Sequence, residues 1–204
     1  MPIETVMLDA LDGVRLQADL DRVEGGWGSV VLTHPHPLYG GDRFSPVVDS
    51  LFRALPAAGF NVIRFDFRGV NESSGEHDNG DSERLDVLAA IELLEVVEPD
   101  AALWLVGYSF GAVVALNVVD PRVTGWIAIA PPLVGAAARC LAANDHRPKT
   151  IVVAAHDQFA PPDVVSPMVA SWTATTMFTL DHADHFLNGR LAPMTDLVLA
   201  ALTA

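Results

Sequence analysis

Apolar residues recur along the chain in two patterns, and their alternation predicts a fold in which strands and helices follow one another. Short, continuously apolar runs are typical of strands that are buried on both faces. The runs of this kind are Val30–Thr33 and Asn61–Phe65. Further predicted strands are Ala102–Val106, Trp126–Ala130, Thr150–Ala155 and Thr176–Leu180. Before them, Ile3–Leu8 and Val14–Leu20 alternate only in part and flank Leu11-Asp12-Gly13, which predicts an opening hairpin.

Segments with helical periodicity separate these strands. The predicted helices are Phe44–Ala58, Ser82–Val97, Ser109–Val119 and Ala192–Leu202. The second is the clearest, because its apolar residues share one face. We expect its acidic residues to lie away from that face; they are Glu83, Asp86, Glu92 and Glu95. The alternation predicts an α/β fold, a three-layer αβα sandwich whose mostly parallel sheet has about eight strands, the first pair antiparallel.

Composition and charge narrow the function classes. The chain has 204 residues, so we expect a single domain over residues 1–204. Its formal net charge of −14 repels phosphate backbones and excludes nucleic acid as an expected partner. One cysteine, Cys140, cannot form an intrachain disulfide. The segment Met1-Pro2-Ile3-Glu4 lacks the features of a secretory leader, so we expect a cytoplasmic protein; its oligomeric state stays open.

One long apolar stretch, Val123–Ala143, resembles a membrane span in hydropathy alone. Pro131, Pro132 and Arg139 interrupt it and basic flanks are missing, so we predict a core strand followed by a short helix and no membrane association. Only 18 residues separate Ala130 from Lys149. That length excludes a large cap domain there, and we expect an open site.

The strongest chemical motif is Gly107-Tyr108-Ser109-Phe110-Gly111, which follows a predicted strand and opens a predicted helix. On such a strained turn, a nucleophile elbow, the serine projects its hydroxyl above the sheet, and its neighbours two positions away must be small. We therefore predict Ser109 as a catalytic nucleophile. Ser73 and Ser74 lie in a polar loop without this setting and are rejected.

Four segments resemble the α/β-hydrolase superfamily, and within it a small, lidless group of esterase-like hydrolases. They are residues 33–41 (THPHPLYGG), 64–70 (RFDFRGV), 107–111 (GYSFG) and 183–186 (ADHF). The resemblance covers nearly the whole chain and implies serine hydrolase chemistry without a cofactor, but no particular substrate. The chain departs from many relatives at Asn71, where they carry glycine, which affects the shape of that loop.

A serine hydroxyl is a weak nucleophile at neutral pH and needs a histidine base oriented by an acid. In this fold class the chain order is serine, acid, histidine. His182 and His185 both follow the strand that ends at Leu180, and the resemblance favours His185, with His182 as the alternative. For the acid we predict Asp157, which directly follows the strand Thr150–Ala155 in a turn that resembles the family's acid turn.

Asp163 and Asp181 are the alternatives for the acid. The three favoured residues, Ser109, Asp157 and His185, fall at the carboxyl ends of separate strands, where ligands bind in parallel sheets.

The site also needs an oxyanion hole, because acyl transfer builds negative charge on the carbonyl oxygen. One predicted donor is the backbone N–H of Phe110, the residue after the nucleophile. The other is expected in His34-Pro35-His36-Pro37, where the prolines have no N–H. This segment resembles the superfamily's His-Gly-x-Pro loop, which favours the N–H of His36 over that of Leu38. His-x-His also occurs in metal sites, but no third ligand is evident and no metal is expected.

Further residues follow the same strand ends. Leu38, Tyr39 and Phe159 are predicted to line the substrate site. Asp66 and Arg68 follow the strand Asn61–Phe65, and we expect them to form a structural ion pair that fixes their loop.

Together these features predict a Ser-His-Asp hydrolase, a carboxylesterase that acts on small-molecule acyl esters through an acyl-enzyme on Ser109. Thioesterase, lactonase, amidase or peptidase activity would use the same three residues. A different class, a non-catalytic binding protein with this fold, also stays open, because a fold does not fix a function.

Overall fold

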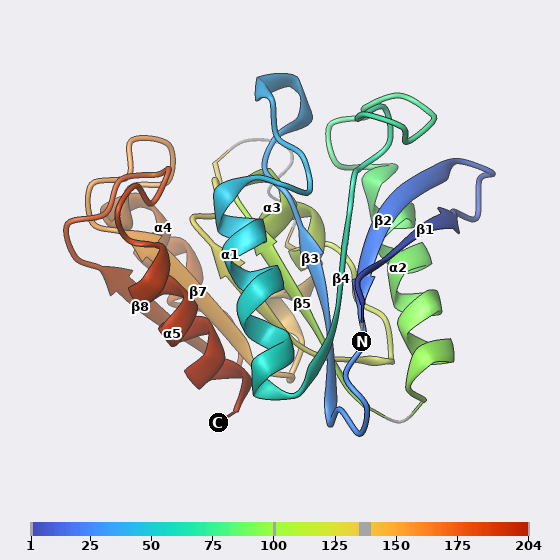
Figure 1. Ribbon diagram of the computed structural model, residues 1–204. Coiled ribbons are helices and arrows are strands. Elements are labelled where there is room, and N and C mark those ends of the chain that lie inside the picture. Colours follow the sequence, from blue (N-terminus) through green and yellow to red (C-terminus); the bar gives the residue numbers. More distant parts are fainter. Residues whose placement is uncertain (1, 100, 135–139, 204) are drawn as a thin grey trace.

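The computed structural model describes residues 2–99, 101–134 and 140–203, and an eight-stranded sheet forms its centre (Figure 1). The strands lie in the order β1-β2-β4-β3-β5-β6-β7-β8. Their bounds are β1 Glu4–Asp9, β2 Arg15–Asp21, β3 Gly28–Thr33, β4 Phe60–Phe65, β5 Ala102–Tyr108, β6 Val123–Ile129, β7 Lys149–Ala154 and β8 Thr175–Leu180. β2 pairs antiparallel with both β1 and β4, and every later pair is parallel.

Helices cover both faces of this sheet. The helices are α1 Pro46–Ala54, α2 Glu83–Val97, α3 Phe110–Leu116, α4 Pro162–Val169 and α5 Leu191–Leu202. Helices α1 and α5 pack together on one face, and α2, α3 and α4 lie on the other (Figure 1). Strands β3, β4 and β7 are buried at every position, which explains their continuous apolar runs. The predicted three-layer αβα sandwich is confirmed.

The predicted element boundaries shift by a few residues for local reasons. The helix expected over 44–58 divides into α1 and a 3-10 turn, Leu55–Ala58, in which Pro56 cannot continue the α-helical ladder. The chain then reverses at Gly59, whose φ of 89° is a conformation that glycine adopts without strain. The helix expected from Ser109 begins one residue later, because Ser109 itself forms the turn.

The prediction for the acidic side of α2 is wrong at two of its four residues. Glu83 and Asp86 are fully buried. Asp86 accepts hydrogen bonds from the backbone N–H, Nε and Nη2 of Arg68 at 2.9, 3.0 and 2.7 Å. Glu83 accepts the backbone N–H groups of Asp78 and Gly80 at 2.9 and 2.8 Å. Helix α2 therefore uses buried carboxylates to hold the long loop between β4 and itself.

The apolar stretch from Val123 begins as strand β6, as predicted. Its later part contains a short 3-10 turn, Leu141–Asn144, while residues 135–139 lie outside the described part of the chain. Among the described residues, no helix has the length and apolar character that crossing a bilayer requires.

Candidate active site

Ser109 lies in a strained turn between β5 and α3. Its φ and ψ of 54° and −118° are rare for a residue with a side chain, and its N–H donates to Ile129 O at 2.8 Å on the neighbouring strand β6. A Cβ on Gly107 would lie 2.5 Å from Gly111 O, and one on Gly111 would lie 2.5 Å from Thr33 O. The two glycines are therefore a steric requirement of this turn.

The structure brings the three predicted catalytic side chains together. Ser109 Oγ lies 2.9 Å from His185 Nε2, and His185 Nδ1 lies 2.8 Å from Asp157 Oδ2. Because Nδ1 faces a carboxylate, it carries the proton in the neutral ring, and Nε2 is left to accept the Ser109 hydroxyl. All three residues are buried, so water competes little for these hydrogen bonds.

Asp157 is held as a carboxylate in this buried place. Burial alone would raise its pKa, but the hydrogen bond from His185 and the backbone N–H groups of Ala160 and Phe159 lower the pKa below its ordinary value. Both N–H groups lie 2.8 Å from Oδ1. The negative charge needed beside an imidazolium is thus preorganised.

The alternatives weighed for the base and the acid lie elsewhere. His182 is exposed and its ring has no hydrogen bond to Ser109; its backbone carbonyl accepts a bond from Arg190. Asp163 lies in the first turn of helix α4, and Asp181 is exposed. Among the described residues, Asp157 is the carboxylate that contacts His185.

The two backbone N–H groups predicted to form an oxyanion hole are both free to donate. The amides of Phe110 and His36 have no hydrogen-bond acceptor among the described residues. The amide of Leu38, the second choice from the sequence, instead donates to His36 Nδ1 at 3.2 Å. The geometry therefore favours His36 and Phe110 as the pair that could hold an oxyanion.

His34 shapes the loop that carries His36. The Phe67 N–H donates to His34 Nε2 at 3.0 Å, so Nδ1 carries the proton and donates to Pro35 O at 2.6 Å. Full burial lowers the pKa of His34 to about 4, which keeps the ring neutral. Both nitrogens are thus engaged by backbone, and the His34-x-His36 pair cannot ligate a metal without breaking these bonds. The described residues contain no group of three or more potential metal ligands.

The expected ion pair between Asp66 and Arg68 is wrong, because each residue pairs elsewhere. Asp66 is fully buried, accepts the Arg43 N–H at 2.8 Å and contacts the Arg43 guanidinium. It also accepts a bond at 2.8 Å from the side chain of Asn71, whose positive φ of 50° suits asparagine. Arg68 turns to Asp86 on α2. These buried charges join the loops after β3 and β4.

Apolar side chains surround the triad at the surface. The predicted lining residues Leu38, Tyr39 and Phe159 are all exposed, Tyr39 by 87%. Phe159 packs its ring 4.8 Å from the ring of His185. Phe186, which sequence reasoning did not single out, lies 5.7 Å from the His185 ring. Aromatic rings therefore flank the base, while Leu38 and Tyr39 lie in the loop that carries His36.

Sequence reasoning also missed a histidine that packs against His36 and Phe110. The ring of His77 lies 4.8 Å from that of His36 and 5.3 Å from that of Phe110. Its Nδ1 is 2.7 Å from Oε1 of the buried Glu83. No pattern in the sequence marks this pair, because both residues come from a loop and a helix start that tertiary contacts bring to the site.

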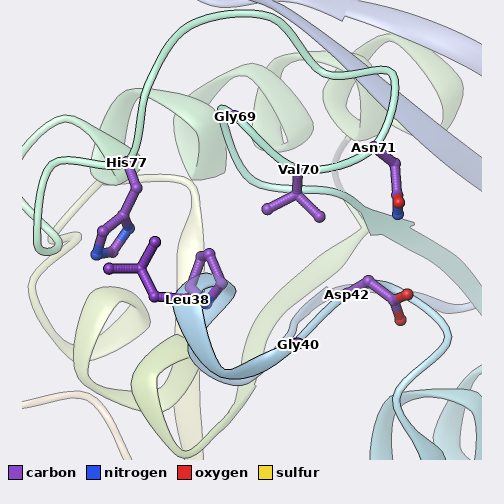
Figure 2. A pocket seen from close by; sticks show the side chains of 9 residues that line it. Leu38, Gly40, Asp42, Gly69, Val70, Asn71 and His77 are labelled. Carbon is purple, nitrogen blue, oxygen red and sulfur yellow. The ribbon is translucent and has the colours of Figure 1, made fainter.

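A pocket of about 300 Å³ opens between the loops after β3 and β4 (Figure 2). Pro37, Leu38 and Val70 supply its apolar lining, and three glycines bring backbone to its wall. The polar lining residues are Asp42, Asn71 and His77. Figure 2 shows the His77 side chain directed from its loop toward Leu38, while Asp42 and Asn71 lie at the other end. Ser109 and His185 are not among the lining residues, so this pocket adjoins the triad without containing it.

Comparison with known proteins gives consistent matches. Residues 28–195 match a family model described as an alpha/beta hydrolase domain. The chain is similar to the structure of an alpha-beta serine hydrolase homologue from Coxiella burnetii, at 30% identity and a TM-score of 0.90, covering 99% of this chain and 98% of that one. It is also similar to XC6422 from Xanthomonas campestris, a serine hydrolase without lid, at 28% identity, a TM-score of 0.85 and coverage of 96% and 92%.

A curated relative extends the comparison to sequence. The uncharacterized protein RP471 from Rickettsia prowazekii (strain Madrid E) is 40% identical over 123 residues, which are 55% of this chain and 52% of that protein. The match thus spans about half the length of that relative.

Proposed function

This chain belongs to the α/β-hydrolase domain family, and on that premise we propose that it is a serine hydrolase that cleaves esters of small acyl groups. The observation that carries the proposal is the unbroken line of hydrogen bonds from Ser109 Oγ through His185 to Asp157. A serine in this arrangement is activated by its base, and the base is oriented by its acid.

The first half of the proposed reaction forms an acyl-enzyme. Ser109 Oγ attacks the ester carbonyl carbon while its proton moves to His185 Nε2. The amides of His36 and Phe110 stabilise the resulting oxyanion, and Asp157 stabilises the imidazolium. When the tetrahedral intermediate collapses, the bond to the alkoxy oxygen breaks and His185 returns the proton to the leaving alcohol.

The second half restores the serine. A water molecule takes the place of the alcohol, gives its proton to His185 Nε2 and attacks the acyl carbon. The Ser109–acyl bond then breaks, the serine oxygen recovers the proton from His185, and the carboxylic acid leaves. No residue changes oxidation state and no cofactor enters either half.

The surroundings of the triad support an uncharged acyl ester as substrate. Arg43 and Arg68, which lie in the loops at this end of the sheet, are buried and paired with carboxylates. They therefore present no free positive charge to an anionic substrate, and the exposed apolar side chains around the site suit an uncharged one.

A fluorophosphonate probe tests the proposal, because it reacts covalently only with an activated serine. We expect labelling of the wild-type protein and of His146→Ala, whose side chain is exposed in the loop before β7, and none of Ser109→Ala. Turnover of p-nitrophenyl acetate and butanoate should follow the same pattern. A folded wild-type protein that is neither labelled nor active would instead be a non-catalytic binding protein, and faster turnover of thioesters or lactones of matched chain length would reassign the substrate.

A further inference from the structure

We propose that the pocket between the loops after β3 and β4 is the acyl subsite of this hydrolase and that it selects acyl groups bearing a hydroxyl. The inference rests on the proposed function, which it deepens by naming a class of substrate. His77 is its specificity-determining residue.

The order of the strands assigns the pocket to the acyl group. Asp157 and His185 follow β7 and β8, which lie on one side of β5 and Ser109. The leaving oxygen must lie within reach of His185, because that residue protonates it. The remaining substituent of the carbonyl carbon, the acyl chain, is then directed away from His185. On that side lie the loops after β3 and β4, which line the pocket.

His77 connects the pocket to the proposed oxyanion hole. His77 lines the pocket, and its ring packs against the rings of His36 and Phe110, the two residues that offer unpaired amides. An acyl chain that leaves the oxyanion hole toward β3 and β4 therefore meets His77. The volume of about 300 Å³ lies at the small end of ligand sites, which suits a short chain.

His77 carries an unsatisfied polar group at this place. Its side chain is only 9% exposed, and Nδ1 lies 2.7 Å from the Glu83 carboxylate. Nε2 is buried and has no hydrogen-bond partner among the described residues. Buried polar atoms nearly always have partners, so an orphan that lines a pocket points to a polar group on the ligand.

A hydroxyl is the ligand group that fits this lining. It can donate to or accept from a ring nitrogen of His77, whichever tautomer the Glu83 carboxylate favours. At the other end of the pocket, Asp42 uses Oδ1 to accept the Phe44 N–H, and its second oxygen has no hydrogen bond to a described residue. A plain alkyl chain would bury the His77 nitrogen and the Asp42 oxygen without a hydrogen-bond partner. The resulting loss of transition-state stabilisation would make kcat/KM lower for alkyl esters than for hydroxy esters.

Isosteric pairs of esters test the inference, because they differ only in a hydroxyl against a methyl group. We would compare p-nitrophenyl 3-hydroxybutanoate with 3-methylbutanoate, and 6-hydroxyhexanoate with heptanoate, after dividing each kcat/KM by the alkaline hydrolysis rate constant. The wild-type protein should prefer the hydroxy ester about tenfold in at least one pair, the effect of one hydrogen bond. In His77→Phe, which keeps an aromatic ring, and in His77→Leu this ratio should fall to about one.

His146→Phe makes the same exchange at an exposed histidine outside the site and should keep the wild-type ratio. Equal or lower turnover of both hydroxy esters by the wild-type protein would overturn the inference, as would a ratio that neither His77 variant changes. If p-nitrophenyl acetate is hydrolysed and Ser109 is labelled while the ratio is one, the acyl subsite alone is wrong. If the folded protein neither hydrolyses an ester nor reacts with the fluorophosphonate, the proposed function fails with it.

Discussion

The two sides of Ser109 are built on different principles. On the side of β7 and β8, the working groups are the side chains of His185 and Asp157, which contact each other directly. On the side of β3 and β4, the proposed working group is the backbone amide of His36. Buried side chains such as Asp66 and His34 hold the loops on this side and take no part in the proposed reaction steps.

This contrast predicts which substitutions will lower activity and which will lower stability. Substitutions on the side of β7 and β8 should remove catalysis and leave the fold, because two side chains held in loops after the strands, His185 and Asp157, carry the function there. Substitutions on the side of β3 and β4 should first cost stability, because they uncover or leave unpaired a buried charge. The four predictions below test this division, from the largest expected free-energy change to the smallest.

The largest effect is expected on the base. His185→Ala should lower kcat for p-nitrophenyl acetate by about 10⁴-fold or more, because the serine loses its proton acceptor. Circular dichroism should show an unchanged fold. His182→Ala, three residues away and exposed, should keep kcat within a few-fold. If His182→Ala is the inactive variant, the base has been misassigned and the contrast between the two sides fails.

On the other side, Asp66→Asn should lower the free energy of unfolding by about 3–5 kcal/mol, because it leaves the buried guanidinium of Arg43 short of a countercharge. Urea denaturation followed by fluorescence measures this change. Asp9→Asn is the matched control: its partner Arg15 is exposed, so we expect a change below about 1 kcal/mol. If the two substitutions lowered the free energy of unfolding equally, the buried pair of Asp66 and Arg43 would contribute no more to stability than the exposed one.

The neutral His34 ring should make stability depend on pH. Its pKa of about 4 in the folded protein lies below the ordinary 6.5, so the unfolded chain binds the proton first as pH falls. Stability that is complete above about pH 6.5 should therefore decline by about 3 kcal/mol toward pH 4. Urea denaturation of wild type and His34→Gln across this range isolates the effect, because glutamine does not titrate. Parallel profiles would contradict it.

The smallest loss of stability and activity is expected at Tyr108, which lies between the two sides. The Tyr108 hydroxyl, at the end of β5, donates to the His185 backbone carbonyl at 2.8 Å. Tyr108→Phe should lower the free energy of unfolding by about 1 kcal/mol and kcat/KM several-fold, because the loop of the base loses one anchor. Tyr39→Phe, at an exposed ring, should leave stability unchanged within about 0.5 kcal/mol. A larger loss in Tyr39→Phe would reverse this ranking.

The same division explains how much the sequence predicts. Ser109, Asp157 and His185 each follow a predicted strand, so their convergence follows from chain order and the geometry of a parallel sheet, while the family resemblance favours His185 over His182. The motif around Ser109 is also readable from the sequence, because a Cβ on Gly107 would clash with Gly111 and Ala112, and one on Gly111 would clash with Thr33 and His34. Fold class and the three side chains could thus be predicted before any coordinates.

The supporting network could not be predicted, for a physical reason. Periodicity treats a carboxylate as solvated, yet Asp86 is buried because Arg68 reaches it from a distant loop. Because Asp66 and Arg68 are close in sequence, they were expected to pair, whereas the ion-pair partner of Asp66 is Arg43. Such pairings depend on which loops meet in space. His77 escaped notice for the same reason, because its neighbours at the site come from three separate segments.

The position of the base at the border of the sheet has a consequence for inactivation. Strand β8 pairs with β7 alone, and half of its residues are exposed, while Ser109 follows an inner strand with neighbours on both sides. Local unfolding starts where burial is least. On warming, β8 and the loop after it should therefore unfold locally and displace the imidazole of His185, while the rest of the sheet and its helices stay folded. Turnover should then be lost below the melting temperature and return on cooling.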